Sequence, residues 1–172
     1  PANIYLQGTR SGPRGKLLDF GIAKALSETS YTLTEQTMGT PYYMSPEQIK
    51  STKSATHQTD IYSFGIVMYH CLTGLVPFHE ESHFLIMQHH MHDPLPRVQL
   101  ELPEALNQEV QQLLDRLTEK EPSERFESFA AVLSAFQQLK RRWPQETEDA
   151  GVPLATPAAI GDLETPTTNI LL

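Results

Sequence analysis

Cysteine, tryptophan and long apolar runs are scarce in this chain of 172 residues, which contains one Cys and one Trp. The lone Cys71 excludes an internal disulfide framework and fits a reducing compartment. No apolar run reaches the roughly 20 residues that a membrane-spanning helix needs, and no signal peptide is visible. We therefore expect a cytoplasmic location and no membrane segment within this chain.

Basic charge is also scarce, with 13 Lys and Arg against 21 Asp and Glu and a net charge of −8. A surface of this sign repels phosphate backbones, so we expect no nucleic-acid partner. Residues 144–172 hold no Lys or Arg and are rich in Pro, Thr, Ala and acidic residues without periodicity. They are predicted to be a disordered tail or linker, whereas residues 1–143 are predicted to form the folded domain.

Two short apolar runs, residues 4–6 and 16–18, flank a Gly-rich stretch. They predict a β-hairpin whose long turn covers residues 7–15. Residues 25–38 are polar, rich in Ser and Thr, and predicted to be a mobile loop. A helix start follows at residues 45–48, where Ser is the cap, Pro takes the first helical position and Gln can reach back to the cap.

The rest of the chain is predicted to be helical. Residues 60–72 are apolar nearly all round and end at Thr73-Gly74, so this helix should be buried on most faces. A shorter helix is expected at about residues 81–90. Two amphipathic helices follow, the second capped by Ser128, with apolar residues at three-and-four spacing. Their apolar positions are Leu106, Val110, Leu113, Leu114 and Leu117, then Phe129, Val132, Leu133, Phe136 and Leu139.

Oxygen ligands suited to a hard divalent cation stand at both ends of the predicted hairpin. Asn3 precedes it, and Asp19 follows it within Asp19-Phe20-Gly21. Folding of residues 4–18 into a hairpin would bring the amide and the carboxylate together. Carboxylate and amide oxygens are what Mg²⁺ accepts, and phosphoryl transfer needs metal ions that bridge the nucleotide phosphates. Asp19 could also be a simple turn residue, and its neighbours decide between the two interpretations.

Several motifs, in order along residues 1 to about 140, resemble those of the protein kinase family, and most closely the bacterial Ser/Thr kinases. Residues 1–3 resemble the end of the catalytic loop, and residues 17–24 resemble the metal-binding turn. Residues 39–47, Gly-Thr-Pro-Tyr-Tyr-Met-Ser-Pro-Glu, are similar to the substrate-docking loop and its A-P-E signature, with Ser45 in place of Ala. Residues 60–65 resemble the start of the central helix, and Arg125 matches a late Arg of the family.

The resemblance implies a role for each matching residue. Asp19 and Asn3 would bind the metal ions, Mg²⁺ or Mn²⁺, that accompany ATP. Thr40 would contact the catalytic base and seat a Ser or Thr acceptor. Glu47 and Arg125 would form a buried ion pair, and Asp60 would accept backbone N–H groups of the catalytic loop.

The resemblance also implies a protein kinase-like α+β fold of which this chain is the C-terminal lobe, mainly helical with a small hairpin at the cleft floor. The family's catalytic Asp would lie five positions before Asn3, so the chain would open inside the catalytic loop. The expected function is ATP-dependent phosphorylation of protein Ser/Thr by an intact parent, with this fragment inactive alone. The parent could be membrane-anchored and could dimerise. The alternative is a pseudokinase, an interaction module without turnover.

Smaller features have two interpretations each. Thr32 and Thr34 resemble the paired phosphorylated threonines of bacterial receptor-type kinases, although such loops are commonly rich in Ser and Thr without modification. His89, His90 and His92 could suggest a metal site, but neighbouring histidines on one helix point to different faces. A solvated helix end is the expectation for them, and Cys71 is expected to fill the core.

Overall fold

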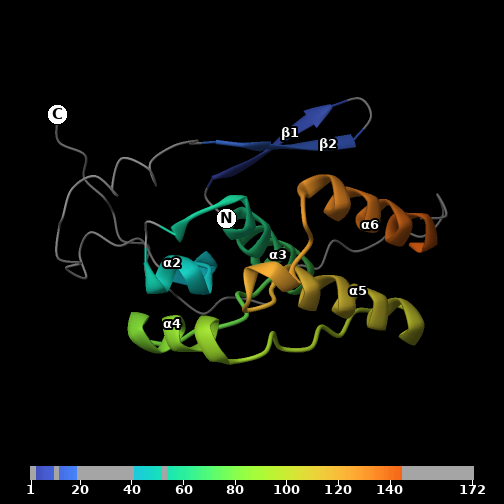
Figure 1. Cartoon of the computed structure of the whole chain (residues 1–172). Coiled ribbons are helices and arrows are strands. Elements are labelled where there is room, and N and C mark those ends of the chain that lie inside the picture. Colours follow the sequence, from blue (N-terminus) through green and yellow to red (C-terminus); the bar gives the residue numbers. More distant parts are fainter. Residues whose placement is uncertain (1–2, 10–11, 19–40, 52–53, 145–172) are drawn as a thin grey trace. The chain divides into compact units, whose positions relative to one another are not determined.

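The computed structural model describes residues 3–9, 12–18, 41–51 and 54–144. Contacts divide the chain into one unit of Pro1–Arg142 and a second of Trp143–Leu172. The helices and strands described below all belong to the first unit. They are one two-stranded sheet followed by helices (Figure 1), so the prediction of a mainly helical fold with one hairpin is confirmed. The predicted domain boundary after residue 143 stays a prediction.

The hairpin consists of β1 (Ile4–Thr9) and β2 (Gly12–Leu17). The strands pair antiparallel, from Ile4 opposite Leu17 to Thr9 opposite Gly12. The prediction of a long turn over residues 7–15 was therefore wrong, because the strands extend to residues 9 and 12. Gly12 adopts a φ of 105°, a conformation that favours glycine. Of the paired side chains only Ile4 is even half-buried, and a position at the floor of a cleft stays a prediction.

A short 3₁₀ turn, η1 (Pro41–Tyr43), leads into helix α2 (Pro46–Lys50), whose start is as predicted. The Ser45 hydroxyl accepts from the backbone N–H of Gln48, and the Gln48 side chain accepts from the backbone N–H of Ser45. Pro46 occupies the first turn, where a helix does not need its missing N–H. This reciprocal capping fixes the direction in which the chain leaves η1.

Helix α3 (His57–Thr73) begins earlier than predicted, because Thr56 and Thr59 form a second capping box. It ends at Gly74, which takes the left-handed conformation with φ 75°. The prediction of burial on most faces is confirmed for ten of the thirteen residues 60–72, which are buried or half-buried. The exceptions are Asp60, Cys71 and Phe64, which is 37% exposed.

Helix α4 (His83–His92) is shifted by two residues from the predicted 81–90. Helix α5 (Glu104–Leu117) buries all five of its predicted apolar positions, and a 3₁₀ turn, η3 (Pro122–Glu124), follows it. Helix α6 (Phe129–Arg142) begins after Ser128, whose hydroxyl accepts from the N–H of Ala131, as expected of a cap.

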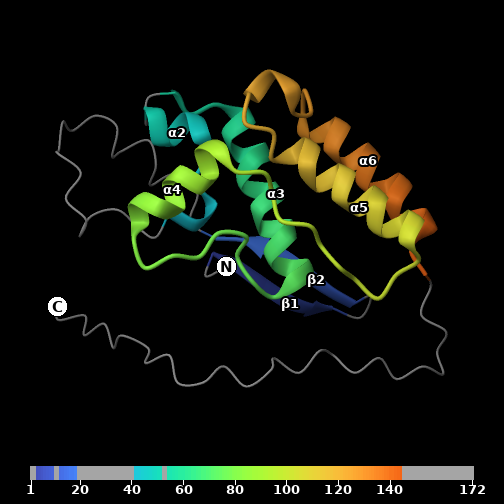
Figure 2. The same cartoon turned by 90° about the horizontal axis from the view of Figure 1, so that it is seen from below.

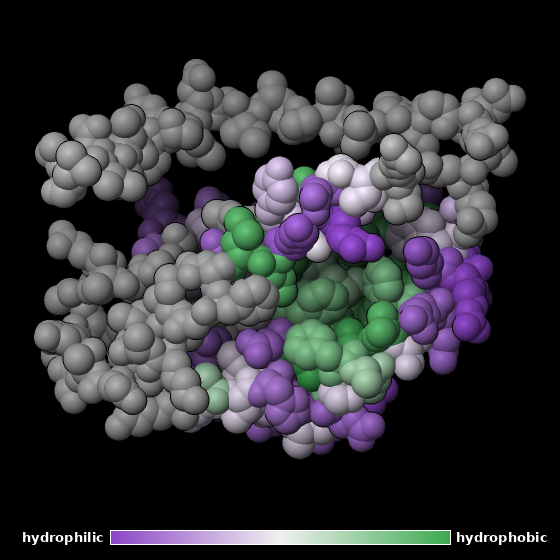
Figure 3. Space-filling view, turned by 90° about the horizontal axis from the view of Figure 1, so that it is seen from above, coloured by the Kyte–Doolittle hydropathy of each residue, from purple (hydrophilic) through white to green (hydrophobic). Residues whose placement is uncertain are grey.

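Only one edge of the α6 apolar stripe is buried. Val132 and Leu139 lie two turns apart on that edge, whereas Phe129, Leu133 and Phe136 are 41–56% exposed. Phe129 meets the exposed Phe64 of α3 edge-on, with ring centroids 5.9 Å apart. Apolar side chains gather on the face seen in Figure 3.

The core lies where α3, α4 and α5 face one another, and its fully buried side chains include Tyr62, Ile86 and Leu114. Helix α3 packs on α5, α5 packs on α6, and α2 packs on α4 (Figure 2). Gly65 marks the closest approach of α3 and α5, since a Cβ there would lie 2.7 Å from Thr118 Cγ2 and 2.8 Å from Leu117 Cβ. The turn η1 contacts both α3 and α4, so the segment after Thr40 rests on the helical core.

Candidate functional site

The open end of the hairpin carries the first predicted metal ligand. The backbone N–H of Leu18 donates to the carbonyl of Asn3 at 2.8 Å, so the residue before β1 lies opposite the residue after β2. Asn3 is exposed. Asp19 follows Leu18 directly in the chain but lies outside the described residues. An amide oxygen such as that of Asn3 is of the kind that a hard divalent cation accepts, and the roles of Asn3 and Asp19 as metal ligands stay predictions.

The predicted substrate-docking loop is described from Pro41 onward, and Thr40 lies outside the described residues. The backbone carbonyl of Tyr43 accepts from the Ser63 hydroxyl at 2.7 Å. The Tyr43 hydroxyl lies 2.8 Å from Nδ1 of His70, and the two rings stack. Both partners belong to α3. The segment Pro41–Tyr43, which we call the docking segment, is therefore held on the central helix by its backbone and by a side chain.

A second tyrosine of the docking segment uses a different partner. The Tyr42 hydroxyl lies 3.1 Å from Nδ1 of His79, a residue between α3 and α4, and these rings also stack. Burial raises the pKa of Tyr43 and lowers the pKa of His70, so this pair is neutral at pH 7. The sequence showed Tyr42 and Tyr43, but nothing in their spacing indicated His70 or His79 as partners.

Glu47 and Arg125 meet as the motifs predict. The guanidinium donates from NH1 to Oε1 and from NH2 to Oε2, each at 2.8 Å, so the pair is bidentate. The Arg125 side chain is fully buried, and that of Glu47 is 11% exposed. Burial by itself raises the pKa of Glu47, but hydrogen bonds from Arg125, together with its charge, outweigh burial and lower the pKa to about 2.

The remaining hydrogen-bond capacity of this pair is also used. The Thr59 hydroxyl donates to Oε1 of Glu47 at 3.0 Å. Arg125 donates to backbone carbonyls at three further positions, which are those of Gln58, Glu119 and Lys120. The guanidinium carbon also lies 4.9 Å from the centroid of the Tyr62 ring. The pair thus ties α2 to the start of α3 and to the loop after α5. Sequence analysis missed Thr59 and Gln58 because they belong to no recognised motif.

Asp60 lies in the first turn of α3 and is exposed. Its expected partners are backbone N–H groups of the catalytic loop, at or before residue 2, and these lie outside the described residues. The role of Asp60 therefore stays a prediction. The possible phosphorylation sites Thr32 and Thr34 also lie outside the described residues.

The three histidines of α4 point in different directions, and the described part of the chain holds no group of three metal-ligating side chains. His89 is partly exposed, and the hydrogen bond with Asp93, at 2.5 Å, raises its pKa. His90, by contrast, is completely buried, so the expectation of a solvated helix end was wrong for this residue. Its Nδ1 lies 2.9 Å from the Tyr62 hydroxyl, and such a long-range partner leaves no signal in the sequence.

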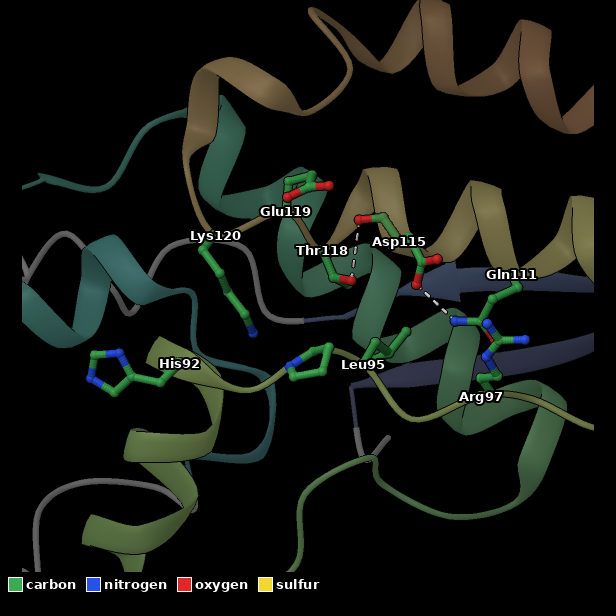
Figure 4. Close-up of a pocket in the computed structure, with 9 residues that line it drawn as sticks. His92, Leu95, Arg97, Gln111, Asp115, Thr118, Glu119 and Lys120 are labelled. Carbon is green, nitrogen blue, oxygen red and sulfur yellow. Dashed lines mark hydrogen bonds between the residues drawn. The ribbon is translucent and has the colours of Figure 1, made fainter.

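Cys71 is exposed on α3 and does not fill the core, contrary to expectation. A separate recess of about 570 Å³ lies between the end of α4 and the end of α5 (Figure 4). Lys120, Asp115 and Arg97 line it, and Gln111 donates to Asp115 at 2.7 Å. None of the predicted site residues lines this recess.

Within the described ranges, no helix is long and apolar enough to cross a membrane.

Comparison with known proteins agrees with this geometry. The family described as "Protein kinase domain" matches residues 1–143. A probable serine/threonine-protein kinase of Clostridium acetobutylicum is 34% identical over 137 residues, which are 78% of this chain and 20% of the relative. Serine/threonine-protein kinase PrkC of Bacillus subtilis is 39% identical over 113 residues, 66% of this chain and 17% of the relative.

A third relative, serine/threonine-protein kinase PknA of Mycobacterium tuberculosis, is 33% identical over 163 residues, 93% of this chain and 36% of that protein. The chain thus spans only 17–36% of the length of these bacterial relatives. The family match covers the hairpin, the docking segment and every helix described above. On this evidence, the chain belongs to the protein kinase family, whose members use ATP and a divalent metal.

Proposed function

We propose that the intact parent of this chain is an ATP-dependent protein serine/threonine kinase. The observation that carries the proposal is the bidentate Glu47–Arg125 pair, which ties the helix after the docking segment to the helical core. A docking segment anchored in this way offers a peptide a fixed surface next to Thr40. The names of the bacterial relatives support Ser and Thr as the acceptor residues.

Each group would have one part in the reaction. Asn3 and Asp19 would hold the divalent cation, for which we propose Mg²⁺, with Mn²⁺ as a substitute. The bound cation would neutralise charge on the nucleotide phosphates. Thr40 would orient the acceptor hydroxyl toward the catalytic base. Tyr43 and Ser63 would keep the docking segment in place while the peptide binds.

Several finer properties belong to the same proposal. The partners would be proteins with Ser or Thr acceptors, and nucleic acids would not bind, because the chain carries a net charge of −8. The kinase region would be cytoplasmic. Thr32 and Thr34 would be phosphorylated, and the added charge would order their loop.

The test is the Asp19→Asn substitution in the intact parent, with transfer of labelled phosphate to a protein substrate as the measurement. The substitution removes charge at the metal and little volume, so phosphoryl transfer should be abolished while the thermal midpoint stays near that of the wild type. Asp93→Asn is the matched control, because it makes the same change at an exposed helix end and should retain activity. Near-normal turnover by Asp19→Asn would contradict the metal-binding role of Asp19. No transfer by the wild type would contradict the kinase function and favour a pseudokinase.

A further inference from the structure

His90 is a polar side chain in the middle of the core. It is completely buried on α4, and its ring meets those of Tyr62 and Phe78 edge-on at centroid distances of 5.8 and 5.0 Å. These neighbours belong to α3 and to the loop before α4. Burial, and then the charge of Lys120, lower its pKa to about 4, so the imidazole is neutral at pH 7. A neutral imidazole has one N–H donor and one acceptor nitrogen.

The hydrogen bond with Tyr62 indicates which nitrogen carries the proton. The Tyr62 hydroxyl lies 2.9 Å from Nδ1 of His90 and 3.5 Å from its carbonyl, so Nδ1 is the better acceptor for the hydroxyl proton. In the tautomer in which Nδ1 accepts this proton, the ring proton is on Nε2. The backbone of Tyr42 interacts with the His90 ring and raises its pKa, as a carbonyl oxygen facing this N–H would.

Nε2 nevertheless has no hydrogen-bond partner among the described residues, although it is buried. The backbone of Tyr42 interacts with the His90 ring, yet no contact of Nε2 with a described residue has the distance and angle of a hydrogen bond. A buried donor without an acceptor destabilises the fold, and a small shift of the docking segment toward α4 would remove this cost. The contacts of η1 with α4 place the segment where such a shift can occur.

We propose that His90 is a positioning residue for the docking segment, whose Nε2–H donates to the backbone carbonyl of Tyr42 when the segment holds a peptide. This inference rests on the proposed kinase function. Tyr62 connects His90 to the Glu47–Arg125 pair, since the Arg125 guanidinium lies over its ring. The docking segment is therefore supported by His90 and by the Glu47–Arg125 pair, which Tyr62 connects into one group of polar side chains.

Two substitutions at this position separate positioning from packing. His90→Gln keeps an N–H donor at about the reach of Nε2, whereas His90→Asn keeps a polar group only at about the reach of Nδ1. In the intact parent, His90→Asn should raise the KM for the peptide about threefold to tenfold, the range expected for one lost hydrogen bond. The KM for ATP and kcat should change little, and His90→Gln should restore a peptide KM near that of the wild type.

A residue that only fills space would give equal peptide KM values in the two variants, and that result would overturn the proposal. Thermal midpoints report the packing loss separately. A second readout does not depend on activity, because ¹⁵N spectra of histidine-labelled chain show which ring nitrogen is protonated. We expect a protonated Nε2 and an unprotonated Nδ1 at pH 7, and the opposite tautomer would overturn the proposal. Absence of transfer by the wild type would refute the kinase function, and the spectra would still decide the tautomer.

Discussion

Arg125 combines more interactions than any single motif suggests. Its side chain is fully buried, forms two hydrogen bonds with Glu47, and reaches backbone carbonyls on both sides of the core. A buried guanidinium is costly to desolvate, and only this complete set of acceptors offsets the cost. The pair is therefore a structural support of the docking segment rather than a group that touches substrate.

Removing either partner of this pair should destabilise the fold strongly. Arg125→Ala strands the Glu47 carboxylate and should cost about 3–5 kcal/mol. Glu47→Ala should cost less, because the guanidinium keeps its carbonyl acceptors. The double variant should lose less than the two single losses added together, since no stranded charge remains. Thermal or urea melts of the four proteins measure this, and strictly additive losses would mean that the two residues are not coupled.

His90 makes the stability depend on pH in a defined window. Its folded pKa of about 4 lies below the ordinary value of 6.5, so between these values the unfolded chain binds a proton that the folded chain does not. The contribution of His90 to the free energy of unfolding is therefore complete above pH 6.5. It falls by at most about 3 kcal/mol as the pH drops toward 4. Glu47, with a folded pKa of about 2, adds a loss between pH 4.5 and 2.

Urea melts at a series of pH values check this dependence. His90→Gln does not titrate and should flatten the curve between pH 6.5 and 4 while the Glu47 loss below pH 4.5 remains. Because the hydrogen bond with Asp93 raises the pKa of the exposed His89, that residue shifts stability in the opposite direction. His89→Gln is therefore the matched control, and a wild-type curve that is flat in this window would contradict the buried neutral state of His90.

At the scale of elements, the approach of α3 to α5 is set by Gly65. Adding a Cβ would bring it within 2.8 Å of Leu117 Cβ, an atom fixed to the α5 backbone that cannot rotate away. We expect Gly65→Ala to force the helices apart and to cost about 1–3 kcal/mol by overpacking. Thermal denaturation measures the loss. Gly74→Ala is the control, because its Cβ would meet open space and only its left-handed backbone, φ 75°, would be strained, at about 1 kcal/mol.

The capping box of α2 is the element-scale link between the docking segment and the ion pair. Ser45→Ala removes the acceptor for the Gln48 N–H and should cost about 1 kcal/mol. Ser45→Thr keeps the acceptor, but Ser45 is fully buried, so the added methyl group tests whether space is limiting. Equal melting midpoints for Ser45→Ala and the wild type would show that the cap contributes nothing measurable.

At the scale of the whole molecule, the proposed metal ligand Asn3 lies at the open end of an exposed hairpin. Apart from Ile4, every paired side chain of β1 and β2 is exposed, so nothing described there encloses a nucleotide. We therefore expect residues 1–172 alone to bind ATP–Mg²⁺ negligibly. Isothermal calorimetry measures this directly. Micromolar affinity would show that the hairpin end and its metal ligands suffice for binding.

The sequence by itself determined the family, the order of the elements and the Glu47–Arg125 pair. These follow from local signals: the Ser45-Pro46 cap, the apolar spacing of α5, and motifs whose residues stand at fixed positions along the chain. Each depends on neighbours within a few residues or on an ordered motif, so no coordinates are needed to recognise it.

Only the tertiary structure decided which faces are covered and which polar groups meet across the core. Burial of His90, exposure of Cys71 and Phe64, and the partners of Tyr42 and Tyr43 depend on residues 27 or more positions apart. Periodicity shows that a helix has an apolar face, but the packing of other elements determines how much of that face is buried. The local sequence around a histidine does not show whether its side chain is buried in a core or exposed to water, because distant parts of the chain form its environment.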